Sequence, residues 1–391
     1  MSDHTKIEWT DATWNVVTGC TVVSPGCTNC YAMGLAGTRL KHHPSRAGLT
    51  DESRAGPVWN GEVRFNEQWL DQPLRWRKPR NIFVCAHGDL FHPAVPDEWI
   101  DRVFAVMALA PHHRFQVLTK RADRMREYVT CVPDCLSPYA FEGERLEGAA
   151  AEIGRSLGWD HDVMGTTGYE AMQSWPLPNV WLGVSVEDQK RADERIPDLL
   201  ATPAAVRWIS AEPLLGPVDL EPWLDWPEGG CELPDGSYFG CAGCDAEGTA
   251  CRCPNDRAYY DTNEGPRDEM GCPEWVHVER IKLDWVVVGG ESGPNARPMH
   301  PDWARSLRDQ CQAAGVAYFF KQWGAWAPGE IAGPNEKPIE AATWWDGKWR
   351  HERVGKADPD QHCDEEPDVF RIGKALAGRL LDGREWNEAP A

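Results

Sequence analysis

The sequence predicts an α/β protein built on a parallel sheet, most simply a (β/α)8 barrel or a partial barrel of the TIM type. Two observations lead to this fold class. Short runs rich in β-branched and aromatic residues recur along the chain, and segments with helical periodicity lie between several of them. Such alternation is typical of parallel sheets, because parallel neighbours need a long crossover connection, usually a helix. An open barrel with six strands is the alternative.

Eight segments have the composition of strands and are expected to follow one another around the barrel: 13–18, 62–65, 82–86, 115–119, 180–184, 206–210, 285–288 and 317–320. Helical patterns lie at 31–40, 68–77, 97–109, 122–128, 191–200 and 301–314. This alternation assigns residues 1–324 to the barrel. Two stretches that break it, 130–178 and 217–280, are expected to be insertions, and 325–391 is expected to be a polar C-terminal extension with one modest helix near 370–381.

Composition narrows the class of protein. No apolar run reaches the roughly 18 residues that a membrane span needs, and the N-terminus has no apolar leader, so we expect a cytoplasmic protein without a membrane partner. The net charge of −21 argues against nonspecific coating of nucleic acid, although a local basic channel is compatible with it. The chain has 14 cysteines, and those that cluster are expected to bind metal or do chemistry, because cytosolic thiols stay reduced.

Three cysteines share one short loop, GCTVVSPGCTNCYA, directly after the first expected strand. Cys20, Cys27 and Cys30 can hold three corners of a 4Fe–4S cluster and leave the fourth iron open. An open iron suits S-adenosylmethionine, whose amino and carboxylate groups can chelate it. The alternatives are a zinc site completed by a distant ligand, and cysteines that are only structural.

Polar residues follow several expected strands, and in a barrel they would converge on one mouth. Any one of them could instead be a solvated loop residue. The glycines of Gly289-Gly290-Glu291 allow close backbone approach and the carboxylate matches a cofactor ammonium, but Glu291 could equally bind substrate and the glycines could only shape a turn. The expected cofactor-binding residues are Ser185, Glu187, Ser210, Glu212, Gly289, Gly290 and Glu291, and the expected substrate-binding residues are Asp89, His92, Lys120, Arg121, Lys321 and Gln322.

A second group of cysteines lies in the later insertion, which leaves the strand 206–210 and is therefore expected over the mouth. It comprises Cys231, Cys241, Cys244, Cys251, Cys253 and Cys272. The close pairs in it predict a small zinc module that uses Cys241, Cys244, Cys251 and Cys253. A second iron–sulfur cluster and a site without metal are the alternatives. Cys85, Cys311 and Cys363 are isolated and are expected to be ordinary thiols.

Several sequence motifs outside the insertions and the C-terminal extension together resemble one family. It is the phage-associated three-cysteine-motif family of uncharacterised radical-SAM-like proteins. The family's neighbours are three-Cys-motif partner proteins. The resemblance implies a barrel of radical SAM type with an iron–sulfur cluster, and a partner of that kind. The first gap between cysteines, six residues, departs from the commoner Cys-x3-Cys-x2-Cys spacing. The motifs that carry the resemblance are residues 6–31, CAHGDLFH at 85–92, LTKR at 118–121, VSVEDQ at 184–189, ISAEPLLGP at 209–217, VVVGGESGPNARPM at 286–299 and FFKQWG at 319–324.

These patterns predict a radical S-adenosylmethionine enzyme that modifies or repairs nucleic acid through a 5′-deoxyadenosyl radical and depends on an electron donor. The phage association that the resemblance implies favours nucleic acid as the substrate. Two basic stretches, 74–80 and 120–126, are compatible with it, since arginine and tryptophan suit phosphate contact and base stacking. Each stretch could instead be a charged helix face. The alternative functions are a non-enzymatic, metal-containing nucleic-acid-binding protein, and a radical enzyme that acts on a peptide or small molecule.

Overall fold

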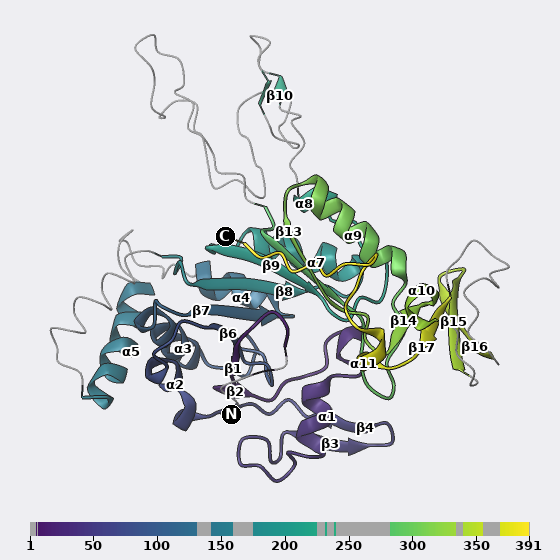
Figure 1. The fold of residues 1–391 in the computed structure, drawn as a ribbon. Helices are drawn as coiled ribbons and strands as arrows, with labels where there is room; N and C mark the ends of the chain where they lie inside the picture. Colours follow the sequence, from purple (N-terminus) through teal and green to yellow (C-terminus); the bar gives the residue numbers. More distant parts are fainter. Residues whose placement is uncertain are drawn as a thin grey trace.

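The structure is a computed structural model that describes residues 5, 7–130, 142–158, 175–224, 231–232, 238–239, 282–333, 339–354 and 368–390. Its main element is a seven-stranded parallel sheet in the order β1-β6-β7-β8-β9-β12-β13 (Figure 1). Because this order follows the chain, the sheet curls in one direction and forms a partial α/β barrel. The strands are β1 (Ala12–Trp14), β6 (Asn81–Val84), β7 (Arg114–Thr119), β8 (Val180–Ser185), β9 (Val206–Ala211), β12 (Trp285–Gly289) and β13 (Ala317–Gln322).

Helices cover the outer face of this sheet (Figure 1). Val180, Leu182 and Val184 of β8 point outward and join the main core, to which Ile196 and Leu199 of α7 also belong. The covering helices are α2 (Gln72–Arg75), α3 (Asp97–Leu109), α4 (Ala122–Thr130), α5 (Glu142–Ser156), α7 (Gln189–Leu200), α8 (Glu221–Leu224) and α9 (Pro301–Ala313).

The inner face of the sheet is filled by aromatic rings. Trp181, Trp208, Trp285 and Phe319 point inward from four strands and pack with Trp9, which precedes β1. Successive strand residues point to opposite faces, so these rings alternate with the outward-facing aliphatic residues of the main core. The interior of the barrel is thus a packed core.

One glycine makes room for this inner packing. A Cβ atom added to Gly183 of β8 would lie 2.5 Å from two atoms of the Trp208 indole, which is inside van der Waals contact. Trp208 is fully buried, so its ring has little freedom to move away. Gly183 is therefore required by the neighbouring strand.

The expected eight-stranded sheet is corrected to seven strands. The segment 62–65 contributes only β5 (Arg64–Phe65), which pairs antiparallel with β2 (Val17–Thr18) outside the main sheet. The expected strand 13–18 is split into β1 and β2. Asn66 explains the split, because its side-chain amide donates to the carbonyl oxygens of Asn15 and Val16 between the two strands.

The C-terminal extension contains more structure than its polarity predicts. It forms an antiparallel sheet in the order β14-β17-β15-β16, and only a four-residue helix stands where a longer helical segment was expected. Residues after that helix run along β13: Phe320 N donates to Trp386 O at 3.0 Å. This contact covers the edge strand of the barrel. The elements are β14 (Trp326–Pro328), α10 (Gly329–Ala332), β15 (Ile339–Trp345), β16 (Lys348–Val354), β17 (Val369–Arg371) and α11 (Lys374–Ala377).

Smaller elements complete the described part: α1 (Tyr31–Gly37), the hairpin β3 (Thr50–Ser53) and β4 (Gly56–Trp59), the 3-10 turns η1 (Pro25–Cys27) and η2 (Glu67–Trp69), and β10 (Cys231–Glu232) with β11 (Tyr238–Phe239). In the first expected insertion, α5 packs on α3.

The predicted zinc ligands Cys241, Cys244, Cys251 and Cys253 lie outside the described residues. No helix among the described segments has both the length and the apolar character of a membrane span.

Candidate functional site

A cavity of about 630 Å³ opens at the carboxyl ends of the parallel strands, where barrels of this kind place their sites. Its volume lies within the usual range for small-molecule sites. His92, Glu187 and Gly289 were expected at this site but do not line the cavity. The expected residues that do line it are Cys20, Cys27, Cys30, Asp89, Lys120, Arg121, Ser185, Ser210, Glu212, Gly290, Glu291, Lys321 and Gln322.

The cysteine loop leaves β2 at Gly19, which has a φ of +98°; a Cβ atom there would lie 2.1 Å from the carbonyl oxygen of Glu62. Glycine alone fits both the conformation and the space. The loop is held at the mouth by Gly26, whose N–H donates to Glu187 Oε1 at 3.3 Å. It ends at Cys30, the residue that precedes α1. The local sequence thus brings all three cysteines to the cavity.

Each of the three sulfur atoms has a polar neighbour. Arg121 Nη1 lies 3.6 Å from Cys20 Sγ, and Ser24 Oγ lies 3.8 Å from Cys27 Sγ. Cys30 accepts hydrogen bonds from the backbone N–H groups of its own helix turn and from the Trp59 side chain. Hydrogen bonds of this kind orient metal-binding thiolates and tune a bound cluster.

Two of these thiols, Cys20 and Cys30, have raised pKa values. Burial raises the pKa of Cys20 to about 12; the Asp89 charge adds to this effect and Arg121 opposes it. Burial also raises the pKa of Cys30, against the hydrogen bonds to its sulfur. Both side chains are therefore protonated at neutral pH, and binding of a metal would release their protons.

The three cysteines of the loop have the side-chain chemistry of iron–sulfur ligands. Within the described segments, no three side chains of the Cys, His, Asp or Glu type converge as the ligands of one metal ion would. A four-iron cluster does not require such convergence, because each thiolate binds a different corner. Cys20, Cys27 and Cys30 line one cavity, so the chemistry of this donor set is compatible with such a cluster.

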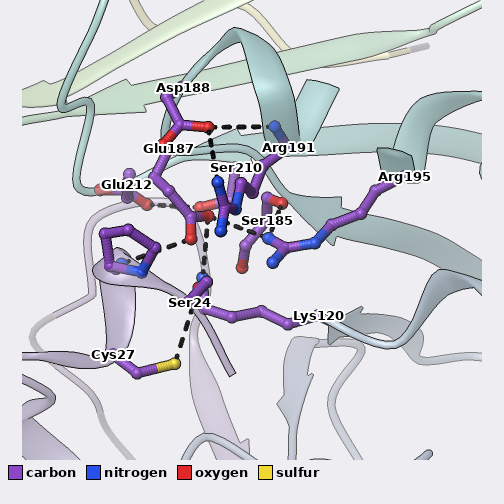
Figure 2. A network of polar contacts seen from close by, with 12 residues as sticks. Ser24, Cys27, Lys120, Ser185, Glu187, Asp188, Arg191, Arg195, Ser210 and Glu212 are labelled. Carbon is purple, nitrogen blue, oxygen red and sulfur yellow. Dashed lines mark hydrogen bonds and ion pairs between the residues drawn. The ribbon is translucent and has the colours of Figure 1, made fainter. Parts of the chain in front are cut away.

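Glu187 is the anionic centre of a buried network below the loop. Its Oε2 lies 2.9 Å from Arg195 and 3.4 Å from Lys120. Figure 2 shows this carboxylate in a network with Ser24 of the cysteine loop and with the two cations. Burial alone would raise the pKa of Glu187, but the charges of Lys120 and Arg195, with hydrogen bonds from Ser24 and the Gly26 N–H, lower it to about 2. Glu187 therefore positions Lys120 and the cysteine loop.

Asp89 and Arg121 form a second buried pair, in which Arg121 Nη1 lies 2.7 Å from Asp89 Oδ2. Asp89 also accepts a hydrogen bond from Thr119, and Arg121 donates to Thr21 of the cysteine loop. His92 lies 3.2 Å from Thr21 Oγ1. These residues, expected to contact substrate, support the cysteine loop in the structure, and Asp89 and Arg121 also line the cavity.

Glu291 is held by two partners. Arg297 donates to both of its carboxylate oxygens, at 2.7 Å and 3.0 Å, and Asn29 of the cysteine loop donates to Oε2 at 2.9 Å. Glu291 could bind a cofactor ammonium only by exchanging Arg297. A Cβ on Gly290 would lie 1.9 Å from the Trp323 carbonyl oxygen, and one on Gly289 would lie 2.6 Å from Glu212 Oε1, so both glycines serve close packing in this turn.

Glu212 and Lys321 form a pair that faces the cavity, with a distance of 2.9 Å between Lys321 Nζ and Glu212 Oε1. Ser210 donates to the other oxygen of Glu212 at 3.2 Å. Gln322 is committed to the backbone, since its amide donates to Gly290 O at 3.1 Å. Glu212 thus makes two contacts in the described structure, whereas Glu291 accepts four hydrogen bonds from Arg297 and Asn29.

Sequence reasoning missed several residues at the mouth. Cys85 lines the cavity, although it was expected to be an ordinary isolated thiol; its place directly after β6 could have revealed it. Tyr31 and Lys374 also line the cavity. Arg195 and Arg297, the partners of Glu187 and Glu291, were not found because nothing local marks them.

The two basic stretches differ in their position. Residues 74–80 lead into the start of β6, at the end of the sheet opposite the cavity, and there Arg80 lies over the Trp76 ring at 4.7 Å. In 120–126, Lys120 and Arg121 line the mouth, whereas Arg126 pairs with Asp198 at 2.8 Å. Only the beginning of the second stretch therefore belongs to the site.

The fold and the cavity define a protein with a partial parallel α/β barrel whose mouth carries three cysteines on one loop. The chain belongs to the DUF5131 family, described as a protein of unknown function, whose model matches residues 4–390. No curated protein and no solved structure matches the chain.

Proposed function

We propose that this protein is an iron–sulfur enzyme of the radical S-adenosylmethionine type that acts on nucleic acid. One observation carries the proposal: Cys20, Cys27 and Cys30 lie on a single loop and line one cavity at the carboxyl ends of a parallel barrel sheet. Three cysteines leave one corner of a four-iron cluster without a thiolate from this loop, and a chelating cofactor can take that corner. The cluster and cofactor would supply one-electron cleavage of the sulfonium, with the electron coming from a donor protein.

The chain's own residues would hold the cofactor in the same cavity. Ser185 and Ser210 offer hydroxyl groups that suit ribose, and Lys321 offers a cation that suits a carboxylate. Glu212 is the better candidate for the cofactor ammonium, because it makes two contacts, with Lys321 and Ser210, whereas four hydrogen bonds hold Glu291. Burial of these groups at the mouth limits water and strengthens their electrostatic contacts.

The nucleic-acid part of the proposal is supported by the side chains around the cavity. Lys120, Lys321 and Lys374 line it, as does the aromatic ring of Tyr31. Cations with an aromatic surface suit phosphates and bases. The net charge of −21 means that binding would be confined to such a local site. A three-Cys-motif partner protein and a cytoplasmic location remain predictions from the sequence.

The test is reductive cleavage of the cofactor. Anaerobically reconstituted protein would be mixed with dithionite and S-adenosylmethionine, and 5′-deoxyadenosine would be measured by chromatography, with and without oligonucleotides. We expect 5′-deoxyadenosine from the wild type and none from Cys27→Ala, with more product when the right nucleic acid is present. A reconstituted cluster that gives no product with any oligonucleotide would leave a non-enzymatic iron–sulfur protein and overturn the proposal.

A further inference from the structure

Tyr31 is an exposed aromatic residue whose ring is nevertheless fixed at the mouth. Its relative exposure is 56%, and it lines the cavity directly after Cys30. Its hydroxyl donates to Ala86 O at 2.8 Å, and the His87 ring packs against it edge-on with 5.6 Å between centroids. Contacts at the hydroxyl and at one side thus hold the ring while more than half of the side chain faces solvent.

The surroundings of Tyr31 suit a ligand that is flat and carries negative charge. Val23 of the same loop also lines this cavity and is 44% exposed, so the rim carries further apolar surface. Lys374 lines the same cavity with a side chain that is 49% exposed; its one described partner is Glu8, at 3.4 Å. A pair at this distance on an exposed side chain is readily exchanged for a phosphate.

We propose that Tyr31 is a stacking platform for an unpaired base of a nucleotide substrate, with Lys374 as a contact for its phosphate. Every base has an aromatic face, so stacking on a fixed ring binds bases without reading their sequence. A base inside a duplex is already stacked on both sides, so the ring can accept only a base that is unpaired or turned out of the helix. This inference rests on the proposed function for its nucleic-acid substrate and adds how the base is held.

The base and the phosphate could belong to a single strand or to a free nucleotide. A competition experiment distinguishes these two ligands. A short fluorescein-labelled single strand would be titrated with the full-length protein and followed by fluorescence anisotropy. The unlabelled strand, a hairpin duplex of the same sequence and a mononucleotide would then be added as competitors. A strand that competes far better than the mononucleotide identifies nucleic acid as the source, and equal competition identifies the free nucleotide.

Three variants test the residue itself. Tyr31→Leu removes the aromatic face and should weaken strand binding about tenfold or more, within the range for loss of one stacked base. Tyr31→Phe keeps the face and should bind almost as the wild type does. Trp345→Leu is the matched control: Trp345 is 48% exposed but does not line the cavity, so its loss should leave affinity unchanged. Lys374→Met should weaken binding and reduce its salt dependence.

The outcomes distinguish this inference from the proposed function. If the wild type binds neither the strand nor the mononucleotide, or if Tyr31→Leu binds as well as the wild type, the platform is overturned. Neither result touches 5′-deoxyadenosine formation, which is measured separately. If binding depends on Tyr31 but the cofactor is not cleaved, the platform stands and the radical function fails. Equal iron content in Tyr31→Leu and the wild type would show that the neighbouring cysteine loop is intact.

Discussion

Asn29 of the cysteine loop donates a hydrogen bond to Glu291 Oε2 at 2.9 Å, across 262 positions of the sequence. The same amide donates to Asn295 O at 2.8 Å. These contacts join the loop that follows the first strands to the segment that follows β12, so they tie opposite ends of the curled sheet together at its mouth. Arg297 holds Glu291 in this position through both carboxylate oxygens.

We therefore expect Glu291→Ala to loosen the mouth. It leaves Arg297 without its carboxylate and Asn29 without one acceptor, which should lower the free energy of unfolding by about 1.5–3 kcal/mol, the range for hydrogen bonds to charged groups. Urea denaturation would measure this change in the free energy of unfolding. Glu385→Ala is the control, because Glu385 makes a 3.9 Å pair with Arg379 and accepts an exposed hydrogen bond from Asn387 at 3.0 Å, and the substitution should cost about 1 kcal/mol or less. Equal effects of the two substitutions would contradict this assignment.

Glu187 predicts a pH-dependent contribution to stability. Its pKa is lowered from 4.5 to about 2 in the folded protein, so its stabilising effect is complete above 4.5 and is lost as the pH falls toward 2. Glu187→Gln leaves Lys120 and Arg195 unpaired and should cost about 3–5 kcal/mol at neutral pH. Unfolding free energies of both proteins, measured against pH, should converge only below 4.5. Curves that stay parallel down to pH 2 would show that Glu187 is not the titrating group.

Arg121 is expected to set the reduction potential of a bound cluster. Its guanidinium lies 3.6 Å from Cys20 Sγ, and reduction adds negative charge beside it. Arg121→Gln should lower the midpoint potential by about 59 mV, which is a tenfold fall in the ratio of reduced to oxidised cluster at a fixed potential. Arg121→Lys keeps the charge and should shift it less. Anaerobic redox titration followed by electron paramagnetic resonance would measure both, and an unchanged potential in Arg121→Gln with full iron content would refute this role.

Gly183→Ala tests the packing inside the barrel. The added methyl group would meet the Trp208 indole at 2.5 Å, and Trp208 is fully buried. Overpacking of this kind should cost about 1–3 kcal/mol. Thermal unfolding should show a lower midpoint for Gly183→Ala. In Gly34→Ala, nothing lies within 4 Å of the added methyl group, so the midpoint should stay close to that of the wild type. A wild-type midpoint for Gly183→Ala would mean that the ring can move.

Much of the barrel could be predicted from the sequence for a simple physical reason. The central strands are buried on both faces, so they read as continuous apolar runs such as Val286–Val288 in β12 (Trp285–Gly289), and the polar residues after them necessarily meet at one edge of the sheet. That logic also placed Glu212 and Lys321 correctly at the mouth. Strands that pair outside the main sheet, such as β5 (Arg64–Phe65), have the same local composition as strands of the main sheet. Composition alone therefore could not distinguish the two kinds of strand.

The hydrogen-bond and ion-pair partners of the site residues could not be predicted from the sequence, for a different reason. The contacts of Glu291 with Asn29, and of Glu187 with Gly26 and Lys120, join positions far apart in the chain, and no local pattern encodes such pairs. Sequence reasoning therefore treated Glu291 as free to bind a cofactor. The C-terminal sheet escaped notice because β16 (Lys348–Val354) is largely exposed and has no alternating apolar pattern.

Iron and sulfide analysis of anaerobically reconstituted protein tests the central claim most directly. The wild type should carry a four-iron cluster with absorbance near 400 nm, and single alanine substitutions of Cys20, Cys27 and Cys30 should each lose most of its iron. Cys85→Ala is the matched control, since Cys85 lines the same cavity from a different element and should keep the full cluster. Retention of iron by all three loop variants, or its loss in Cys85→Ala, would contradict a cluster held by the three cysteines of this loop.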